Sequence, residues 1–303
     1  MYLERLVINM TFAKKIVKFT GLRRKKKLNR SAAGDITLFA VLLFFGMFSA
    51  FPLVMTASNA LKSLDELFLF PPRLFPRNIT FDNFRDLSEL VGNSWITFSR
   101  YFFNTLLITI TGTLGHVLIA SMCAYPLAKF KFPGRSIFFT LVVYSLMFAP
   151  QVTATPNYII VARIGLIDSP LAIILPAIAS SLGLYLMKQF MQQIPDELIQ
   201  SAKIDGASEY RIFFQIVMPL VKPAWLTLII LLFQRLWITD GGAFIVSEEL
   251  KPVSYALRQI AAGTIERAGT IAAVSFIMMI VPVTFFIISQ SKIVETFSHS
   301  GMK

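Results

Sequence analysis

The sequence has few of the side chains that perform covalent chemistry or bind metals. Its single cysteine, Cys123, has no partner for an internal disulfide, and two histidines in 303 residues give no zinc-ligand cluster. It has no Gly-Lys dipeptide for a phosphate-binding P-loop, and neither a G-x-S-x-G nor an H-E-x-x-H motif. We therefore expect no catalytic residue, no metal site and no cofactor bound by this chain. Cys123, within an apolar run, is expected to pack as a small hydrophobic residue.

Charged residues are also scarce. They make up 15% of the chain, against 55% apolar residues and a mean hydropathy of +0.65, whereas soluble domains carry roughly 25% charged residues. This composition excludes disordered, collagen-like and coiled-coil proteins and argues against a soluble domain. We predict an all-α polytopic membrane protein.

The positive charge is concentrated near the first residue. Residues 1–30 hold ten Lys or Arg and one acidic residue, so nine of the twelve net positive charges lie there. Such segments are typical of contact with nucleic acid or with a membrane surface. Because this one directly precedes a long apolar run, we interpret residues 1–34 as a basic cytoplasmic tail and expect no nucleic-acid partner.

Apolar runs without charge indicate the membrane spans. A span needs about 20 apolar residues, and five runs after the tail are long enough and free of charge. A sixth run is interrupted by Arg235. We expect a transmembrane domain over residues 35–303, with its contacts to lipid made by six helices. The expected spans are approximately 36–57, 102–126, 137–154, 170–189, 223–240 and 269–291.

Short connections indicate the orientation of these spans. The 129–135 connection carries Lys129, Lys131 and Arg135 without an acid, whereas the charges of the 62–100 loop cancel. By the positive-inside rule, the 129–135 connection and both termini are expected in the cytoplasm. The connection between the fourth and fifth spans then lies in the cytoplasm as well.

That connection has the pattern of two short helices. Pro195 suits a first helical turn, Asp205-Gly206 provides a left-handed stop, and Ser208 suits the cap of a second helix. Four apolar residues follow at helical spacing on one face: Ile212, Phe213, Ile216 and Val217. We predict a compact two-helix knob with an apolar face over residues 195–219.

This loop resembles the EAA loop of importer permeases in the ATP-binding-cassette superfamily. The core of that loop is E-A-A, three residues, a glycine, nine residues and I-x-L-P. Here Gln200-Ser201-Ala202 takes the place of E-A-A, Gly206 that of the glycine, and Ile216 to Pro219 that of I-x-L-P. The wider loop pattern, with residues 127–135 and 156–169, resembles the carbohydrate-uptake branch of the maltose-transporter type.

The resemblance implies one of two permease subunits of a binding-protein-dependent importer in a prokaryotic cell membrane. The implied partners are a second, different permease subunit, an external solute-binding protein and two cytoplasmic ATPase subunits. Those ATPase subunits would bind ATP and Mg²⁺, and this chain would have no catalytic site of its own. The implied substrate is a carbohydrate, expected to be an oligosaccharide, with an acidic glycan as an extension.

The resemblance also assigns residues that couple the knob to an ATPase subunit. The family's loop has a glutamate that pairs with a basic residue of the ATPase, whereas this chain has Gln200. Glu197 lies one turn earlier on the same face of a helix and is expected to take over that contact. The expected coupling residues are Glu197, Gln200, Ser201, Ala202, Asp205, Gly206, Ala207, Phe213 and Pro219.

Arg235 interrupts the fifth span. At a rise of 1.5 Å per residue it lies about 18 Å from the start of the span, past the midplane of a core roughly 30 Å thick. One interpretation is that Gln234, Arg235, Trp237 and Asp240 line the substrate path, because a planar donor fork beside an aromatic ring suits sugar hydroxyls or a carboxylate. The other is that Arg235 reaches the outer interface, or pairs with Asp240 or Glu266 merely to hold helices together.

Two other function classes are weaker. An ion-coupled secondary transporter needs paired carboxylates or histidines inside its spans, and the five charge-free runs contain no acid. A membrane enzyme or a receptor has no nucleophile, metal or base constellation in this sequence and no need for the knob. We therefore favour an importer permease, with the secondary transporter as the alternative.

Overall fold

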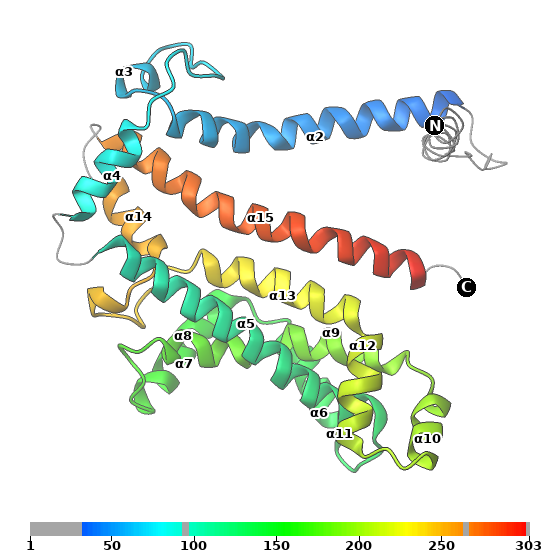
Figure 1. Ribbon diagram of the computed structural model, residues 1–303. Coiled ribbons are helices and arrows are strands. Elements are labelled where there is room, and N and C mark those ends of the chain that lie inside the picture. The colour runs from blue at the N-terminus through cyan, green and yellow to red at the C-terminus, as the bar shows by residue number, and fades with distance from the viewer. Residues whose placement is uncertain (1–31, 93–96, 263–266, 301–303) are drawn as a thin grey trace, which may run out of the picture. The chain divides into compact units, whose positions relative to one another are not determined.

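The computed structural model describes residues 32–92, 97–262 and 267–300, and every regular element among them is helical (Figure 1). The all-α fold expected from the apolar runs is therefore observed for these residues. Contacts within the chain divide it after Pro52 into two compact units, residues 1–52 and 53–303. Of the expected 1–34 tail, only residues 32–34 fall within the described part.

Helix α2 (Ala32–Ala60) has one acidic residue, Asp35, in its first turn. Over the expected span 36–57, which it contains, it carries no charge and is apolar on all sides. The most apolar stretch of this helix is entirely unburied within the chain. A helix that is hydrophobic on every side requires a membrane or a partner around it. Pro52 lies inside α2 without ending it. Membrane helices tolerate such a proline where neighbouring groups bond to the backbone carbonyl that it leaves free.

Two short helices follow, α3 (Leu64–Leu67) and α4 (Asp82–Gly92). Buried Lys62 donates from Nζ to the Arg73 carbonyl at 2.5 Å. The backbone N–H of Arg77 donates to Glu66 Oε1 at 2.9 Å. These bonds fold the proline-rich segment between α3 and α4 back onto the residues that follow α2. That segment contains no helix, as its prolines predict.

Helix α5 (Phe98–Lys129) is the centre of the second unit. It packs against α8 (Leu171–Ile178), α9 (Ser181–Gln192) and α13 (Lys222–Trp237). Between α5 and α8 the chain forms α6 (Arg135–Ser145) and α7 (Pro150–Arg163), whose axes meet at 112°. The segment where the third span is expected, 137–154, thus forms a sharply bent pair of helices rather than one straight helix.

The remaining helices form the knob and the second half of the unit. Helix α15 packs against α13, α14 and α4. The bounds are α10 (Asp196–Ile204), α11 (Glu209–Arg211), the π-helix η1 (Ile212–Val217), α12 (Met218–Leu220), the 3-10 helix η2 (Glu248–Leu250), α14 (Val253–Ala261) and α15 (Ala268–Ser300).

Four helical segments in the described part are long and apolar enough to cross a membrane, or up to six if each bent pair forms one span. The four are within α2, α5, α8 with α9, and α15. The two bent pairs are α6 with α7, and residues 209–220 with α13. A polytopic membrane protein is therefore supported, while six spans with both termini in the cytoplasm stay a prediction.

The expected packing of Cys123 is wrong: this residue is exposed on the surface of the chain. It lies on the side of α5 that also exposes Ile119 and Met122. An apolar neighbourhood in the sequence does not distinguish the packed side of a membrane helix from the side that faces lipid or a partner.

A buried histidine holds the break between α8 and α9. His116 of α5 bonds through Nδ1 to the Ile178 carbonyl at 2.8 Å, so Nδ1 carries the hydrogen. This meets the expectation of a helix–helix hydrogen-bonding group for this residue type. Gly183 of α9 allows the approach, because a Cβ there would lie 1.8 Å from His116 Nε2.

We expect Gly183→Ala to destabilise the protein by about 1–3 kcal/mol, the usual cost of overpacking a filled site. Thermal unfolding of the purified chain in detergent measures the effect. Gly46→Ala is the matched control, because a Cβ at Gly46 meets nothing within 4 Å. The double variant His116→Ala/Gly183→Ala lacks the ring that the new Cβ would meet. Its loss of stability should therefore be smaller than the sum of the losses in the two single variants. A loss equal to that sum would contradict the contact.

Candidate functional site

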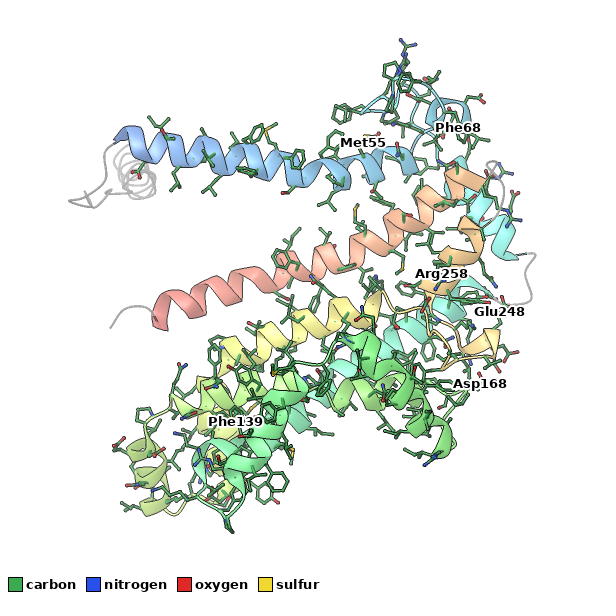
Figure 2. All side chains as sticks on the ribbon, turned by 180° about the vertical axis from the view of Figure 1, so that it is seen from behind. Met55, Phe68, Phe139, Asp168, Glu248 and Arg258 are labelled. Carbon is green, nitrogen blue, oxygen red and sulfur yellow. The ribbon has the colours of Figure 1, made fainter. Side chains whose placement is uncertain are left out.

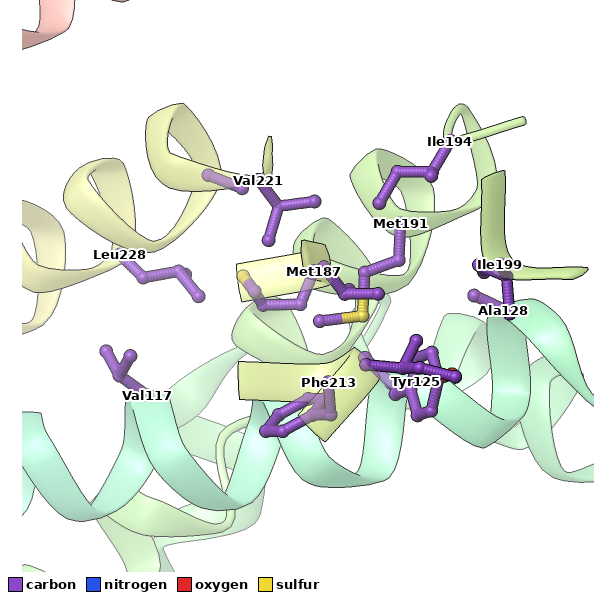
Figure 3. Close-up of a cluster of buried hydrophobic side chains, with 14 of the residues drawn as sticks. Val117, Tyr125, Ala128, Met187, Met191, Ile194, Ile199, Phe213, Val221 and Leu228 are labelled. Carbon is purple, nitrogen blue, oxygen red and sulfur yellow. The ribbon is translucent and has the colours of Figure 1, made fainter. Parts of the chain in front are cut away.

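The knob, residues 195–219, packs on the ends of two spans. Its inward side chains Ile199, Phe213 and Val217 are buried in a cluster with Met187 and Met191 of α9. Figure 3 shows the two methionines at the centre of this cluster, with Tyr125 and Phe213 beside them. The Tyr125 and Phe213 rings lie 5.5 Å apart. The predicted apolar face of the knob therefore faces the chain's own helices.

The turn between the two knob helices has the predicted chemistry. Gly206 has φ +79°, a left-handed conformation that L side chains adopt at a cost. Ser208 caps the next helix by accepting from the Arg211 backbone N–H at 3.4 Å. A Cβ at Gly206 would meet nothing within 4 Å, so backbone conformation alone favours glycine within this chain.

A π-helix in the second knob helix was not predicted. Residues Ile212–Val217 form the wider turn, which buries Ile212, Phe213 and Val217 while Phe214 stays exposed. Such turns are rare and occur frequently at functional sites. The sequence carries no local signal for it beyond the apolar run of residues 212–217.

The expected coupling residues lie on two sides of the knob. Ala202 and Phe213 are buried in the cluster, and Ala207 packs against it. The exposed members are Glu197, Gln200, Ser201, Asp205, Gly206 and Pro219. Sequence reasoning missed four large exposed apolar residues of the knob: Leu198 at 40%, Ile204 at 86%, Tyr210 at 75% and Phe214 at 51% exposure. The sequence has no periodic signal that separates them from the buried apolar positions, since exposed Phe214 directly follows buried Phe213.

Two polar contacts bind the knob to the end of α5. Lys129, whose side chain is 5% exposed, forms a 2.7 Å ion pair with Asp196 and also donates to the Ile194 carbonyl. The hydrogen bond from Lys129 holds the pKa of the Asp196 carboxyl below its usual range. The Tyr125 hydroxyl donates to Glu209 Oε2 at 3.1 Å, and Lys203 pairs with the other oxygen of Glu209.

The second candidate region is the end of α13 farthest from the knob. Gln234 and Arg235 are exposed on one side of this helix. Among the described residues, Arg235 has no hydrogen bond or ion pair. Trp237 lies on the packed side, where its indole N–H donates to the Met278 carbonyl at 2.9 Å and its ring stacks on Phe233.

Asp240, the fourth expected path residue, forms an ion pair with Arg258 of α14 and accepts from the Gly242 N–H. The proposed pairing of Asp240 with Arg235 is therefore not observed, and Glu266 lies outside the described residues. Asp240 and Arg258 also line a groove of about 480 Å³ together with Lys251, Tyr255 and Gln259. The Lys251 ammonium lies 3.9 Å above the centre of the Tyr255 ring.

Residues 241–252, the capping loop, form most of the connection from α13 to α14. Its backbone N–H groups at Val246 and Ser247 donate to Asp168 Oδ1 at 2.9 and 2.6 Å, and the Ser247 hydroxyl donates to the other oxygen. The Ser247 hydrogen bonds hold the pKa of the Asp168 carboxyl below its usual range. Figure 2 shows Asp168, Glu248 and Arg258 near one end of the unit and Phe139 toward the other.

The N-terminal end of α5 holds the other side of the capping loop. Asn104 Nδ2 donates to the carbonyls of Glu249 and Lys251 at 2.7 and 3.0 Å. The Tyr101 hydroxyl donates to Glu248 Oε1 at 2.9 Å, and Thr105 Oγ1 accepts from the Val253 N–H at 2.9 Å. Sequence reasoning did not find this set, because its partners are about 145 residues apart in the chain.

In the described part of the chain, no group of three His, Cys, Asp or Glu side chains is placed to hold a metal ion.

Comparisons with known proteins agree on one family. Residues 116–296 match the model described as binding-protein-dependent transport system inner membrane component. The chain is 32% identical over 199 residues to the sn-glycerol-3-phosphate transport system permease protein UgpE of Pectobacterium atrosepticum, covering 65% of this chain and 71% of the relative. It is 33% identical over 215 residues to the arabinooligosaccharides transport system permease protein AraQ of Bacillus subtilis, covering 69% and 75%.

Solved structures are similar in fold. A chain of a bacterial ABC transporter involved in the import of the acidic polysaccharide alginate has a TM-score of 0.73 at 19% identity, covering 86% of this chain and 98% of that chain. A chain of a bacterial alginate ABC transporter, solved with an alginate pentasaccharide-bound periplasmic protein, has a TM-score of 0.56 at 14% identity, covering 84% and 91%.

Asp168 has φ +65°. Because glycine adopts this backbone conformation readily, Asp168→Gly preserves the conformation while removing the carboxylate. We expect faster hydrogen exchange at Val246 and Ser247 in this variant at pH 7, and an intermediate effect in Asp168→Asn. The pKa of Asp168 is lowered in the folded state. Its contribution to the stability of the capping loop is therefore complete above an ordinary aspartate pKa of about 3.9, and it is lost as the pH falls through the lower folded value. Wild-type protection in Asp168→Gly would contradict this role.

Proposed function

Because the chain belongs to the family of binding-protein-dependent transport system inner membrane components, we propose that it is one of two permease subunits of an ATP-driven sugar importer. In this proposal the partner is a different permease subunit, and two ATPase subunits bind ATP and Mg²⁺ on the cytoplasmic side. An external solute-binding protein delivers the substrate. The periplasmic protein named with the alginate transporter structure supports that partner.

The arrangement in the membrane is part of the proposal. Six spans, with α6–α7 as the third and α13 as the fifth, put both termini and the knob in the cytoplasm. The 1–34 segment is then the basic tail, and residues 35–303 form the transmembrane domain. The capping loop and its groove lie on the outer side.

The observation that carries the coupling proposal is the exposed side of the knob. One side is filled by the chain's own spans, while Ile204, Tyr210 and Phe214 present large apolar surfaces on the other. A water-facing apolar surface of this kind indicates a protein contact. We assign that contact to an ATPase subunit, with Glu197, Gln200, Ser201 and Asp205 providing the surrounding polar contacts. Gly206 and Ala207 shape the turn, and Ala202, Phe213 and Pro219 hold the knob's form.

Ile204→Gln tests this assignment. Burying an isoleucine contributes about 1.5–3 kcal/mol, so its loss should weaken co-purification with the ATPase subunits by about tenfold or more. Membrane insertion should be unchanged. Ile79→Gln is the matched control, since Ile79 is similarly exposed at 65% and is outside the knob. Equal assembly of the two variants would argue against ATPase docking at Ile204.

We further propose that the side of α13 with Gln234 and Arg235 lines the substrate path, supported from behind by Trp237 and, at its end, by Asp240. An arginine facing lipid near the membrane centre costs roughly 2.5–3.5 kcal/mol on insertion scales. Arg235 has no partner in the described part of this chain, and in this proposal the water of the path solvates it. The substrate is then an oligosaccharide, with an anionic group suited to the guanidinium.

The relatives' names support the carbohydrate class and include anionic compounds. Glycerol phosphate and alginate are anionic, whereas arabinooligosaccharides are neutral. The alternative of an ion-coupled secondary transporter receives no support from the family.

Arg235→Gln separates path lining from helix pairing. We expect normal assembly and an uptake reduced by roughly tenfold or more, as for a lost hydrogen bond to a charged group. Arg235→Lys should retain part of the activity. The probes are radiolabelled sn-glycerol-3-phosphate, arabinooligosaccharides and alginate oligosaccharides, tested with the cognate solute-binding protein. Failure to assemble, or normal uptake of the transported probe, would contradict the path assignment.

A further inference from the structure

A groove at the start of α6 combines basic and apolar side chains, at the end of the unit that carries the knob (Figure 1). It has a volume of about 580 Å³ and is lined by Lys131, Phe132, Pro133, Gly134, Arg135, Ser136 and Ile137. Two of these residues are cationic and Ser136 offers a hydroxyl, whereas none is acidic. The groove therefore suits a ligand that has an anionic group next to an apolar one.

Positive charge exceeds negative charge around this groove. Lys129, Lys131 and Arg135 all act electrostatically on a single carboxylate, that of Asp196, whose direct ion pair is with Lys129. Arg135 donates instead to three neutral backbone carbonyls near the end of α5. Lys131 is exposed and forms neither a hydrogen bond nor an ion pair with the described residues. An anion in the groove would complement this charge and would find the Lys131 ammonium available.

A further cation lies between α6 and α9. Lys188 of α9 is only 9% exposed, and its ammonium lies 3.8 Å from the centre of the Phe139 ring. Within the described part of the chain, Lys188 has no carboxylate partner, and its charge repels that of Arg135. The Phe139 ring stacks on Tyr185 with 5.9 Å between ring centres, which holds this side of α6 against α9. The buried ammonium thus adds to the positive potential at the start of α6.

The opposite side of α6 is an apolar stripe. At 3.6 residues per turn, positions 137, 141 and 144 lie together and point away from the packed side that Phe139 marks. Ile137, Leu141 and Tyr144 are 68%, 59% and 57% exposed, and α6 buries none of its residues within the chain. Ile137 belongs to both the stripe and the groove. The apolar surface therefore continues directly from the basic groove along α6.

The continuity of groove and stripe favours one class of ligand. A free phosphate ion would match the cations but leave Phe132, Ile137 and the stripe uncovered. An apolar protein surface would cover the stripe but leave the Lys131 charge without a partner. An anionic phospholipid satisfies both, because its phosphate and its acyl chain are joined in one molecule. Basic pockets beside membrane-facing helices are typical sites for such headgroups.

We propose that the groove of residues 131–137 binds an anionic phospholipid. Lys131, Arg135 and Ser136 hold the phosphate, and the acyl chain lies along Ile137, Leu141 and Tyr144. This inference rests on the proposed function only in placing the start of α6 at a membrane surface. It goes beyond that function, because the lipid is a bound component of the protein and is not the transported substrate.

The test uses the full chain with its co-purifying subunits in nanodiscs of neutral lipid. The probe is a small fraction of phosphatidylglycerol with a photoactivatable diazirine on one acyl chain, and phosphatidylcholine with the same group is the zwitterionic comparison. Mass spectrometry after illumination measures the labelled fraction of the peptide that contains residues 136–145. We expect phosphatidylglycerol to label this peptide at least about fivefold more, the preference that one basic residue provides at an anionic surface.

Variants of Lys131 test the headgroup contact. Lys131→Gln removes the cation that has no other partner, so phosphatidylglycerol labelling of the α6 peptide should fall by about fivefold. Lys131→Glu should abolish the preference for phosphatidylglycerol. Lys222→Gln is the matched control, since Lys222 is also exposed, lies at the first residue of α13 and is outside the groove. Its labelling should equal that of the wild type.

Three results would overturn the lipid site. They are equal labelling by the two lipids, an equal loss in Lys131→Gln and Lys222→Gln, and displacement of the probe by inorganic phosphate, which would indicate a soluble anion. A photoactivatable amino acid in place of Leu141 tests the occupant in an otherwise wild-type chain. Cross-linking to lipid supports the proposal, whereas cross-linking to a protein subunit overturns it.

The readout is independent of transport. Absence of ATPase subunits from the purified complex would overturn the proposed function, while the labelling of α6 would still be measured on the same sample. Failure of the lipid site and failure of the proposed function are therefore distinguishable.

Discussion

Packing of the knob on α5 and α9 is the contact on which the rest of the structure depends. Met187 and Met191 are fully buried there, and the knob contributes Ile199, Ile212 and Val217 to the same cluster. Each such side chain contributes about 1.5–3 kcal/mol when buried. Because the knob also connects α9 to α13, this cluster fixes the relation between those two spans as well as the position of the loop.

Polar side chains complete the structure where helices are interrupted. A backbone group freed by a break has no water to bond with inside a bilayer, so another segment must satisfy it. His116 does this for the Ile178 carbonyl at the α8–α9 break. From the connection that follows α5, Arg135 likewise donates to a carbonyl near the end of that helix. Outside the apolar segments, Asp168 serves the capping loop in the same manner. These contacts join segments that hydropathy alone treats as independent.

Some features of the knob were predictable from the sequence, and others were not. The positive φ of Gly206, the Ser208 cap and the buried face of Ile212 and Val217 were predictable, because each depends on neighbouring residues. The π-helix was not, because its wider turn depends on packing against α5 and α9. Ala202 illustrates the same limit. The resemblance assigned it to coupling with an ATPase subunit, and the structure buries it in the chain's own core.

In the membrane helices, the limit is the similarity between a packed side and a lipid-facing side. Both are apolar, so the sequence predicted the spans without predicting the exposure of Cys123 or the burial of Trp237.

A charge removes this ambiguity where it occurs. Beyond Asp35 in its first turn, the exposed surface of α2 is compatible with lipid, whereas the surface of α13 that carries Gln234 and Arg235 is not. With Asp240 paired to Arg258, the guanidinium of Arg235 depends on groups outside the described part of this chain. The two helices therefore expose surfaces of different kinds, and only that of α13 requires water or a protein partner for its stability.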